Sequence, residues 1–248
     1  MDRIELERYL NDLLRIAQFR DYCPNGLQVE GKRRIGKIAT GVTASLAFID
    51  AALEWGADAL LVHHGYFWRD EAPQITGRKY RRLKRLMEND VSLFAYHLPL
   101  DSHPEFGNNV QLGARFGWIV DAHFGENDIG CMTTMPVPIT LAHFAAEVEQ
   151  TLGRAPLVLG DPDWKLRRFA WCTGAAQGLF DAAINAGADV FLTGEVSEQT
   201  THASAESGVA FLAAGHHATE KFGVQALGAH LAETFDIEHL FVDIPNPV

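Results

Sequence analysis

The pattern of apolar and polar positions near the start of the chain predicts a helix followed by an extended segment. Apolar residues at positions 6, 10, 13 and 14 recur at helical spacing, which predicts an amphipathic helix over residues 3–17. The stretch 24–31 then opens with Pro-Asn-Gly, which is turn chemistry, and leads into a short extended segment.

A strand–helix–strand pattern follows. Short apolar runs over residues 37–41 and 59–62 predict two strands, and the periodicity over 46–55 predicts the helix between them. A basic helical stretch over 78–88 leads to a third strand over 91–96. Because the connections between these elements are short, the pattern predicts a parallel sheet.

The second half of the chain repeats this pattern. Asp50 and Asp181 are 131 positions apart, and the Gly-Ala-Asp triplets that begin at Gly56 and Gly187 have the same separation. A strand with a Gly turn precedes each repeat, and an apolar strand follows it. We therefore expect an internally duplicated α/β fold, with two similar lobes whose sheets are flanked by helices and which pack about a pseudo-twofold axis.

The segment between the repeats marks the expected domain boundary. Residues 119–138 contain a Gly-Glu-Asn-Asp turn and two prolines, so we interpret this segment as irregular. The first α/β lobe is then residues 1–125 and the second is residues 126–248. The strand at the end of the chain is expected to return to the first lobe.

Composition and charge narrow the classes of partner. The net charge of −11 argues against direct nucleic-acid binding and suits a protein that gathers divalent cations. The three cysteines show no C-x-x-C spacing, which indicates reduced thiols. No apolar run approaches the ~18 residues that span a bilayer, and the N-terminus does not resemble a signal peptide. We therefore expect a cytoplasmic protein without a membrane partner.

Imidazoles and carboxylates follow several of the predicted strands. His63 and His64 end one apolar run, and Asp101 follows the next strand along the chain. His216 and Glu220 are four positions apart and would share one face of a helix. The ends of parallel strands can converge on one rim of a sheet. These five donors suit divalent transition metals and are enough for two open metal sites that share a water.

Each of these signals also has a plainer interpretation. His216 and Glu220 would equally form a surface pair on a helix, and Asp101 would serve as a cap or turn residue. His97 is a candidate for a substrate contact, a proton shuttle or a residue that supports the ligands. His103 and His217 are weaker candidates for such roles. Four other histidines are interpreted as structural polar residues, namely His123, His143, His230 and His239.

Two further features remain open. The stretches 41–45 and 174–178 are Gly turns between a strand and a helix, and such turns can cradle phosphate or be ordinary loops. Glu195 occupies the position in the second half that the histidine pair holds in the first. It would line the same cleft or cap the next helix, and we do not assign it as a metal ligand.

Five motifs together make the chain recognisable. They are His63-His64-Gly65, His97-Leu98-Pro99-Leu100-Asp101, Gly107-Asn108-Asn109, Gly194-Glu195-Val196-Ser197 and Gly215-His216-His217-Ala218-Thr219-Glu220. With them the chain resembles the Nif-three-like dinuclear metal centre family, many members of which are labelled GTP cyclohydrolase I type 2 homologues. The resemblance runs from Asp21 to Pro247 and is to the short bacterial form, which lacks an inserted domain.

The resemblance implies a metal centre and an activity. It implies two divalent metal ions per chain (Zn, Fe, Mn or Ni) held by His63, His64, Asp101, His216 and Glu220, with Glu220 as a bridge. It implies a hydrolase resembling GTP cyclohydrolase I type 2, in which a bridging hydroxide attacks a nucleotide or related small molecule and His97 moves protons. It also implies a ring-shaped homohexamer. The alternative is a non-catalytic regulatory or scaffold protein, in which the ions tie the lobes together.

Overall fold

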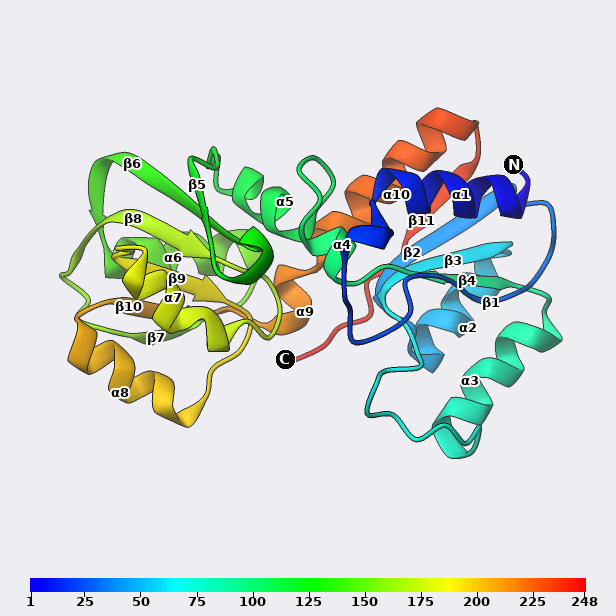
Figure 1. Cartoon of the computed structure of the whole chain (residues 1–248), viewed down its shortest axis with the longest axis horizontal. Coiled ribbons are helices and arrows are strands. Elements are labelled where there is room, and N and C mark those ends of the chain that lie inside the picture. Colours follow the sequence, from blue (N-terminus) through cyan, green and yellow to red (C-terminus); the bar gives the residue numbers. More distant parts are fainter. The chain divides into compact units, whose positions relative to one another are not determined.

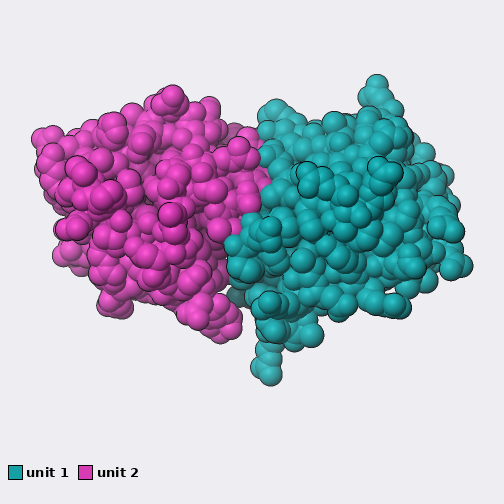
Figure 2. Space-filling model, turned by 90° about the horizontal axis from the view of Figure 1, so that it is seen from above, with its two compact units in different colours: residues 1–106, 223–245 teal, residues 107–222, 246–248 magenta.

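The computed structural model describes all 248 residues, which form two compact units. Unit 1 comprises residues 1–106 and 223–245, and unit 2 comprises residues 107–222 and 246–248 (Figure 2). These ranges differ from the expected division at residue 125. The difference arises because helix α5 (Asn108–Arg115) packs into the core of unit 2. Helix α10 (Lys221–Phe235) and strand β11 (Glu238–Phe241) pack instead on the sheet of unit 1.

Unit 1 is built on a five-stranded sheet in the order β1-β4-β3-β2-β11 (Figure 1). Four of the strands are parallel, and β1 at the edge runs antiparallel to β4. The elements are α1 (Arg3–Leu13), η1 (Ile16–Gln18), β1 (Gly26–Val29), β2 (Lys37–Thr43), α2 (Leu46–Trp55), β3 (Ala59–His64), α3 (Gly77–Glu88), β4 (Ser92–Ala95), α4 (Leu98–Asp101), α10 (Lys221–Phe235) and β11 (Glu238–Phe241).

Helices cover both faces of this sheet (Figure 1). On one face Leu60 and Val62 of β3 pack in a core with α2 and α3. On the other face Leu61 of β3 and Phe94 of β4 pack with α1 and α10. Because β3 is buried on both faces, its sequence reads as a continuous apolar run rather than an alternating one.

Unit 2 is built on a six-stranded sheet in the order β5-β6-β8-β9-β10-β7. Strands β8, β9 and β10 are parallel, and the others run antiparallel to their neighbours. Helices α5 and α6 pack on one face, and α7 and α8 pack on the other. The elements are α5 (Asn108–Arg115), β5 (Ala122–Phe124), η2 (Glu126–Asp128), β6 (Gly130–Thr140), α6 (Leu141–Leu152), β7 (Leu157–Leu159), β8 (Lys165–Trp171), η3 (Gln177–Leu179), α7 (Phe180–Asn185), β9 (Val190–Thr193), α8 (Glu198–Ser207), β10 (Ala210–Ala213) and α9 (His216–Thr219). No helix of either unit combines the length and the apolar character needed to span a bilayer.

The internal duplication is confirmed down to individual hydrogen bonds. Strands β2, β3 and β4 have the same order and direction as β8, β9 and β10. In unit 1, Asp58 Oδ2 accepts hydrogen bonds from the backbone N–H groups of residues 36–37 at 2.9 and 3.1 Å. In unit 2, Asp189 Oδ2 accepts hydrogen bonds from the N–H groups of residues 167–168 at 2.7 and 2.8 Å. All of these positions are related by the same separation of 131 residues.

The first helix and the first Gly turn differ from the sequence prediction. Helix α1 ends at Leu13 rather than at residue 17, because Arg15 adopts the left-handed conformation with φ of 51°. Strand β2 continues to Thr43, so Gly41 lies inside the strand and not in a loop that could cradle phosphate.

The segment 119–138, which we interpreted as irregular, contains strand β5 and most of strand β6. Two prolines misled the prediction because proline cannot donate to a β-ladder. The pairing of β6 with β8 shifts in register between Thr134 and Ile139. Pro136 and Pro138 fall in this interruption of the ladder, where no backbone donor is needed.

Candidate metal centre

Strand β3 brings His63 and His64 to the rim of the unit 1 sheet. They are the last two residues of the strand, which pairs with β2 on one side and β4 on the other. His63 is fully buried and His64 is half-buried. Their ring centroids are 4.5 Å apart, although consecutive strand residues ordinarily point to opposite faces. Because the strand ends here, both rings can face the same site.

His63 faces a buried carboxylate through its outer ring nitrogen. Its Nδ1 lies 3.0 Å from the backbone oxygen of Tyr96, and because a carbonyl only accepts, Nδ1 carries the proton. In the neutral ring Nε2 then holds the lone pair, and it lies 3.4 Å from Oδ1 of Asp101. Asp101 is the last residue of α4 and is 7% exposed. A nitrogen and an oxygen donor held this way in a buried place favour a shared cation.

His97 lies against the same pair of rings. Its ring centroid is 5.1 Å from that of His63 and 5.8 Å from that of His64. One ring nitrogen from each of the three histidines lies within 4.8 Å of the others, so this group could hold a metal ion. The Nδ1 of His97 is 2.7 Å from Oδ1 of Asp21, whose Oδ2 accepts a hydrogen bond from the Leu98 N–H at 2.9 Å.

Asp21 and Cys23 have opposite protonation tendencies although both lie beside His97. Burial raises the pKa of Asp21, but hydrogen bonds from His97 and Asn25 and the charge of His97 outweigh it, and the pKa ends below its ordinary value. When His97 is neutral, the ionised Asp21 holds the proton on its Nδ1 and leaves Nε2 as the acceptor. Burial, with the charges of Asp21 and Asp101, raises the pKa of Cys23 to about 12. The Cys23 thiol therefore stays protonated at neutral pH, and a metal that binds its sulfur must displace that proton.

Unit 2 brings His216 and Glu220 together, as their spacing predicts. The Nε2 of His216 lies 3.1 Å from Oε2 of Glu220, which is 3% exposed. The helix expected to run on from Gly215 is broken, because α9 is a single turn and Glu220 has non-helical backbone angles before α10 begins at Lys221.

Glu195 supports His216 from the other side of its ring. Oε1 of Glu195 lies 2.6 Å from Nδ1 of His216, and the cap of helix α8 is supplied by Ser197 instead. Burial lowers the pKa of His216, but hydrogen bonds and charges from Glu220 and Glu195 outweigh it and raise the pKa to about 9. Both ring nitrogens therefore carry a proton at neutral pH, and a metal that binds Nε2 must displace the proton there.

Gly174 leaves the space that the Glu220 carboxylate occupies. A Cβ on Gly174 would overlap Oε1 of Glu220 and would lie 3.3 Å from Nε2 of His216. The N–H of Gly174 also donates to the hydroxyl of Thr219 at 3.0 Å, which ties α9 to this turn. The second Gly turn of the sequence therefore packs directly against the His216–Glu220 pair.

Several supporting residues were not singled out from the sequence. Thr43 Oγ1 lies 3.3 Å from Nδ1 of His64, and Asn25 Oδ1 accepts the backbone N–H of His97 at 2.7 Å. The available signal was the polar turn from Asp21 to Asn25, which belonged to the family resemblance but had no assigned role. Its contacts with His97 join segments more than 70 positions apart, and spacing does not reveal such contacts.

Comparisons with known proteins place the chain in one family over its whole length. A family model described as Duf34/NIF3 (NGG1p interacting factor 3) matches residues 1–247. Proteins named GTP cyclohydrolase 1 type 2 homolog are 54% identical in Pseudomonas aeruginosa, over 98% of this chain and 96% of that one, and 51% identical in Escherichia coli K12, over the full length of both. The structure of TTHA1606 from Thermus thermophilus is 39% identical, covers 100% of both chains and superposes with a TM-score of 0.90. The chain therefore belongs to the Duf34/NIF3 family, as its motifs predicted.

Proposed function

We propose that the chain is a metal-dependent hydrolase that binds two divalent metal ions. The observation that carries the proposal is the His63–Asp101 pair, a lone-pair nitrogen and a buried carboxylate oxygen 3.4 Å apart. Unit 2 repeats this donor pair in His216 and Glu220. Imidazole with carboxylate suits Zn, Fe, Mn or Ni. The proposed ligands are His63, His64, Asp101, His216 and Glu220, with Glu220 as the bridge.

The residues of this chain also fit the group that they would hold. Gly174 keeps space open at the Glu220 carboxylate, and Glu195 fixes the orientation of the His216 ring, as outer partners do for metal-bound histidines. When bound, such a metal pair supplies a Lewis acid and an activated water for hydrolysis.

His97 is the proposed proton carrier. Asp21 holds the proton on Nδ1 of His97, so Nε2 is free to take a proton from an attacking water or to pass one to a leaving group. The family resemblance and the printed name of the relatives support a nucleotide or a related small molecule as the substrate. The family resemblance also implies a homo-oligomer, and we propose a ring of six chains. Light scattering should then give six times the 27.4 kDa of one chain, and a monomeric mass would contradict the ring.

Metal analysis of purified protein tests the proposed centre. We expect about two equivalents of metal per chain in the wild type, since two metal ions per site are proposed. His63→Ala in unit 1 and Glu220→Gln in unit 2 should each remove metal, together with any activity found in a screen of nucleotide hydrolysis. His202→Ala is the matched control, because His202 is an exposed histidine of unit 2 paired with Glu198. Full metal content in both ligand variants would contradict the proposed metal centre.

Chelation separates the hydrolase from the non-catalytic alternative. An enzyme whose ions serve chemistry should lose turnover on chelation with little change in melting temperature. A regulatory or scaffold protein should instead melt at a lower temperature or change its oligomeric state, because metal binding then contributes folding free energy.

A further inference from the structure

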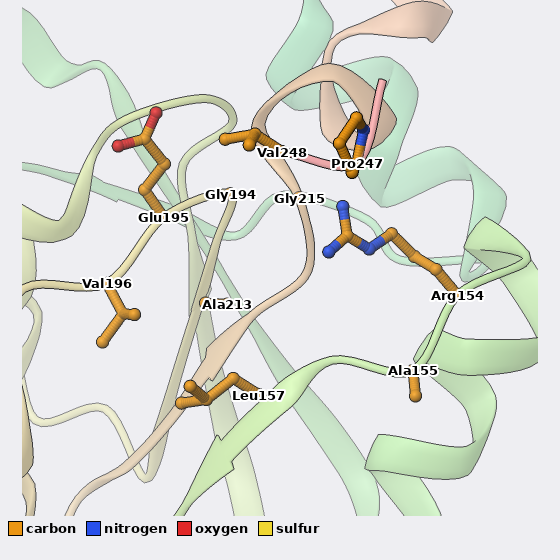
Figure 3. Close-up of a pocket in the computed structure, with 10 residues that line it drawn as sticks. All are labelled: Arg154, Ala155, Leu157, Gly194, Glu195, Val196, Ala213, Gly215, Pro247 and Val248. Atoms are coloured by element: carbon orange, nitrogen blue, oxygen red, sulfur yellow. The ribbon is translucent and has the colours of Figure 1, made fainter. Parts of the chain in front are cut away.

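Unit 2 contains a pocket of about 440 Å³ that includes Glu195 in its wall (Figure 3). Because Glu195 also holds the ring of His216, the pocket adjoins the proposed metal ligands of this unit. Its volume is in the range of small-ligand sites. Apolar side chains form much of its lining, among them Leu157, Val196 and Ala213.

Arg154 enters this pocket because of the way helix α6 ends. Gly153 terminates α6 with φ of 72°, and strand β7 begins three residues after Arg154. The guanidinium packs on Gly215, where any Cβ would overlap Nη1. Figure 3 shows the guanidinium pointing into the pocket, whereas the carboxylate of Glu195 points away from it.

One nitrogen of the Arg154 guanidinium has no hydrogen-bond acceptor in the protein. Its Nη1 is buried and makes no hydrogen bond. The carboxylate of Glu195 is engaged by His216 at 2.6 Å and does not form an ion pair with the guanidinium. A buried N–H donor without an acceptor is unfavourable, and the planar fork of arginine matches two oxygens of a carboxylate or phosphate.

We propose that this pocket is an oxyanion subsite, in which Arg154 binds the phosphate or carboxylate group of a small molecule. The apolar lining contacts the body of that molecule, and its anionic end lies at Arg154. The identification of the bound molecule as the substrate rests on the proposed function, whereas the oxyanion subsite itself does not. Arg154 is thus a binding residue that sets substrate class and orientation.

Calorimetric titration of two probes, inorganic phosphate and benzoate, tests the subsite. The protein is used as purified, with its metal content measured in every sample. Arg154→Gln should weaken binding of the preferred probe by about tenfold or more, since it removes hydrogen bonds to a charged group. Arg154→Lys keeps the charge but not the fork and should be intermediate. Arg167→Gln is the matched control, because Arg167 is an exposed arginine of the same unit.

Each outcome of the titration either supports or overturns the oxyanion subsite. A loss of phosphate binding that depends on Arg154 identifies a phosphate ester, and a loss confined to benzoate identifies a carboxylate. Equal affinity in the wild type and Arg154→Gln, or no binding of either probe to the wild type, overturns the subsite. If Arg154→Gln does not fold, unchanged affinity in Arg154→Lys overturns it. Failure of the proposed function would appear as missing metal or turnover while binding through Arg154 persists.

Discussion

Strands β3 and β9 occupy equivalent places in the two units, yet they end in different residues. Strand β3 ends in His63 and His64, and the positions 131 residues later hold Gly194 and Glu195, just beyond β9. Unit 2 obtains its imidazole from the next strand instead, where His216 begins α9 after β10. The duplicated frame therefore fixes where chemistry can be placed in each unit, and the residues placed there have diverged.

The two units also hold their imidazoles with different acceptors. Nδ1 of His63 is held by the backbone carbonyl of Tyr96, which is neutral, whereas Nδ1 of His216 is held by the carboxylate of Glu195. Burial lowers the pKa of His216, but hydrogen bonds and charges from Glu220, and to a smaller extent from Glu195, raise it to about 9. Two carboxylates thus face the ring of His216, and metal binding at this ring is coupled to proton release.

The largest expected effect is the difference in metal affinity between two variants at equivalent positions. One variant removes a proposed metal ligand, and the other changes a residue that only orients a ligand. His64→Ala removes a proposed ligand of unit 1 and should abolish metal binding. Glu195→Gln keeps an oxygen that can accept from Nδ1 of His216, so metal affinity should fall by only about 10–100-fold. Competition with a chelating dye measures both affinities. An equal loss in the two variants would mean that Glu195 is itself a ligand.

Most of the frame could be predicted from local sequence. The helix over Leu46–Trp55 and the strands around it were predicted within a few residues because period and turn signals agree there. Strand β6 was missed because its prolines argue against a strand, and only the register shift opposite β8 accommodates them. The assignment of α10 to unit 1 depends on tertiary packing, which periodicity does not reveal, whereas the return of the terminal strand to the first lobe is expected from the sequence.

The candidate site likewise has some features that local sequence predicts and others that depend on contacts between distant segments. The pairing of His216 and Glu220 was predicted from their spacing on one helix, and the pair forms although the helix is broken at Glu220. The Asp21–His97 contact joins distant segments, and the space beside Gly174 depends on a neighbouring turn. Arg154 gave no signal, because a lone arginine after a helix is ordinary until the pocket around it is known.

A comparison of two glycine variants measures how much the Glu220 carboxylate depends on the empty space beside Gly174. Gly174 and Gly208 both have φ of 71°, but a Cβ on Gly208 meets nothing within 4 Å. Gly208→Ala should therefore cost only the left-handed strain of about 1–2 kcal/mol in unfolding free energy. Gly174→Ala adds an overlap with Glu220 and should cost about 1–3 kcal/mol more.

Denaturant unfolding and metal analysis of the two glycine variants measure this difference. Metal affinity should fall in Gly174→Ala, because the added methyl group displaces the Glu220 carboxylate, and should stay unchanged in Gly208→Ala. Equal stabilities and equal metal contents would show that the Glu220 carboxylate does not depend on the space at Gly174.

The smallest expected effect concerns the repeated aspartates of the two frames. Asp58 and Asp189 make the same pair of backbone hydrogen bonds, but Asp58 also forms an ion pair with Lys32 at 2.8 Å. Asp189→Asn should lower the unfolding free energy by about 1 kcal/mol. Asp58→Asn should lower it by a further ~0.2–1 kcal/mol, which is the usual contribution of a partly exposed ion pair.

The pH dependence of the Asp58→Asn effect identifies its electrostatic part. Burial raises the pKa of Asp58, but hydrogen bonds from Lys32 and the backbone N–H groups of residues 36–37 outweigh it, so the folded pKa lies below the ordinary value. The ionised carboxylate therefore stabilises the fold fully above the unfolded pKa of ~3.9, and this contribution is lost as the pH falls toward the lower folded value. The stability difference between wild type and Asp58→Asn should thus be constant from neutral pH to about pH 5 and shrink below about pH 4. A difference that grows on acidification would show that Asp58 is destabilised by ionisation and that its hydrogen bonds do not outweigh its burial.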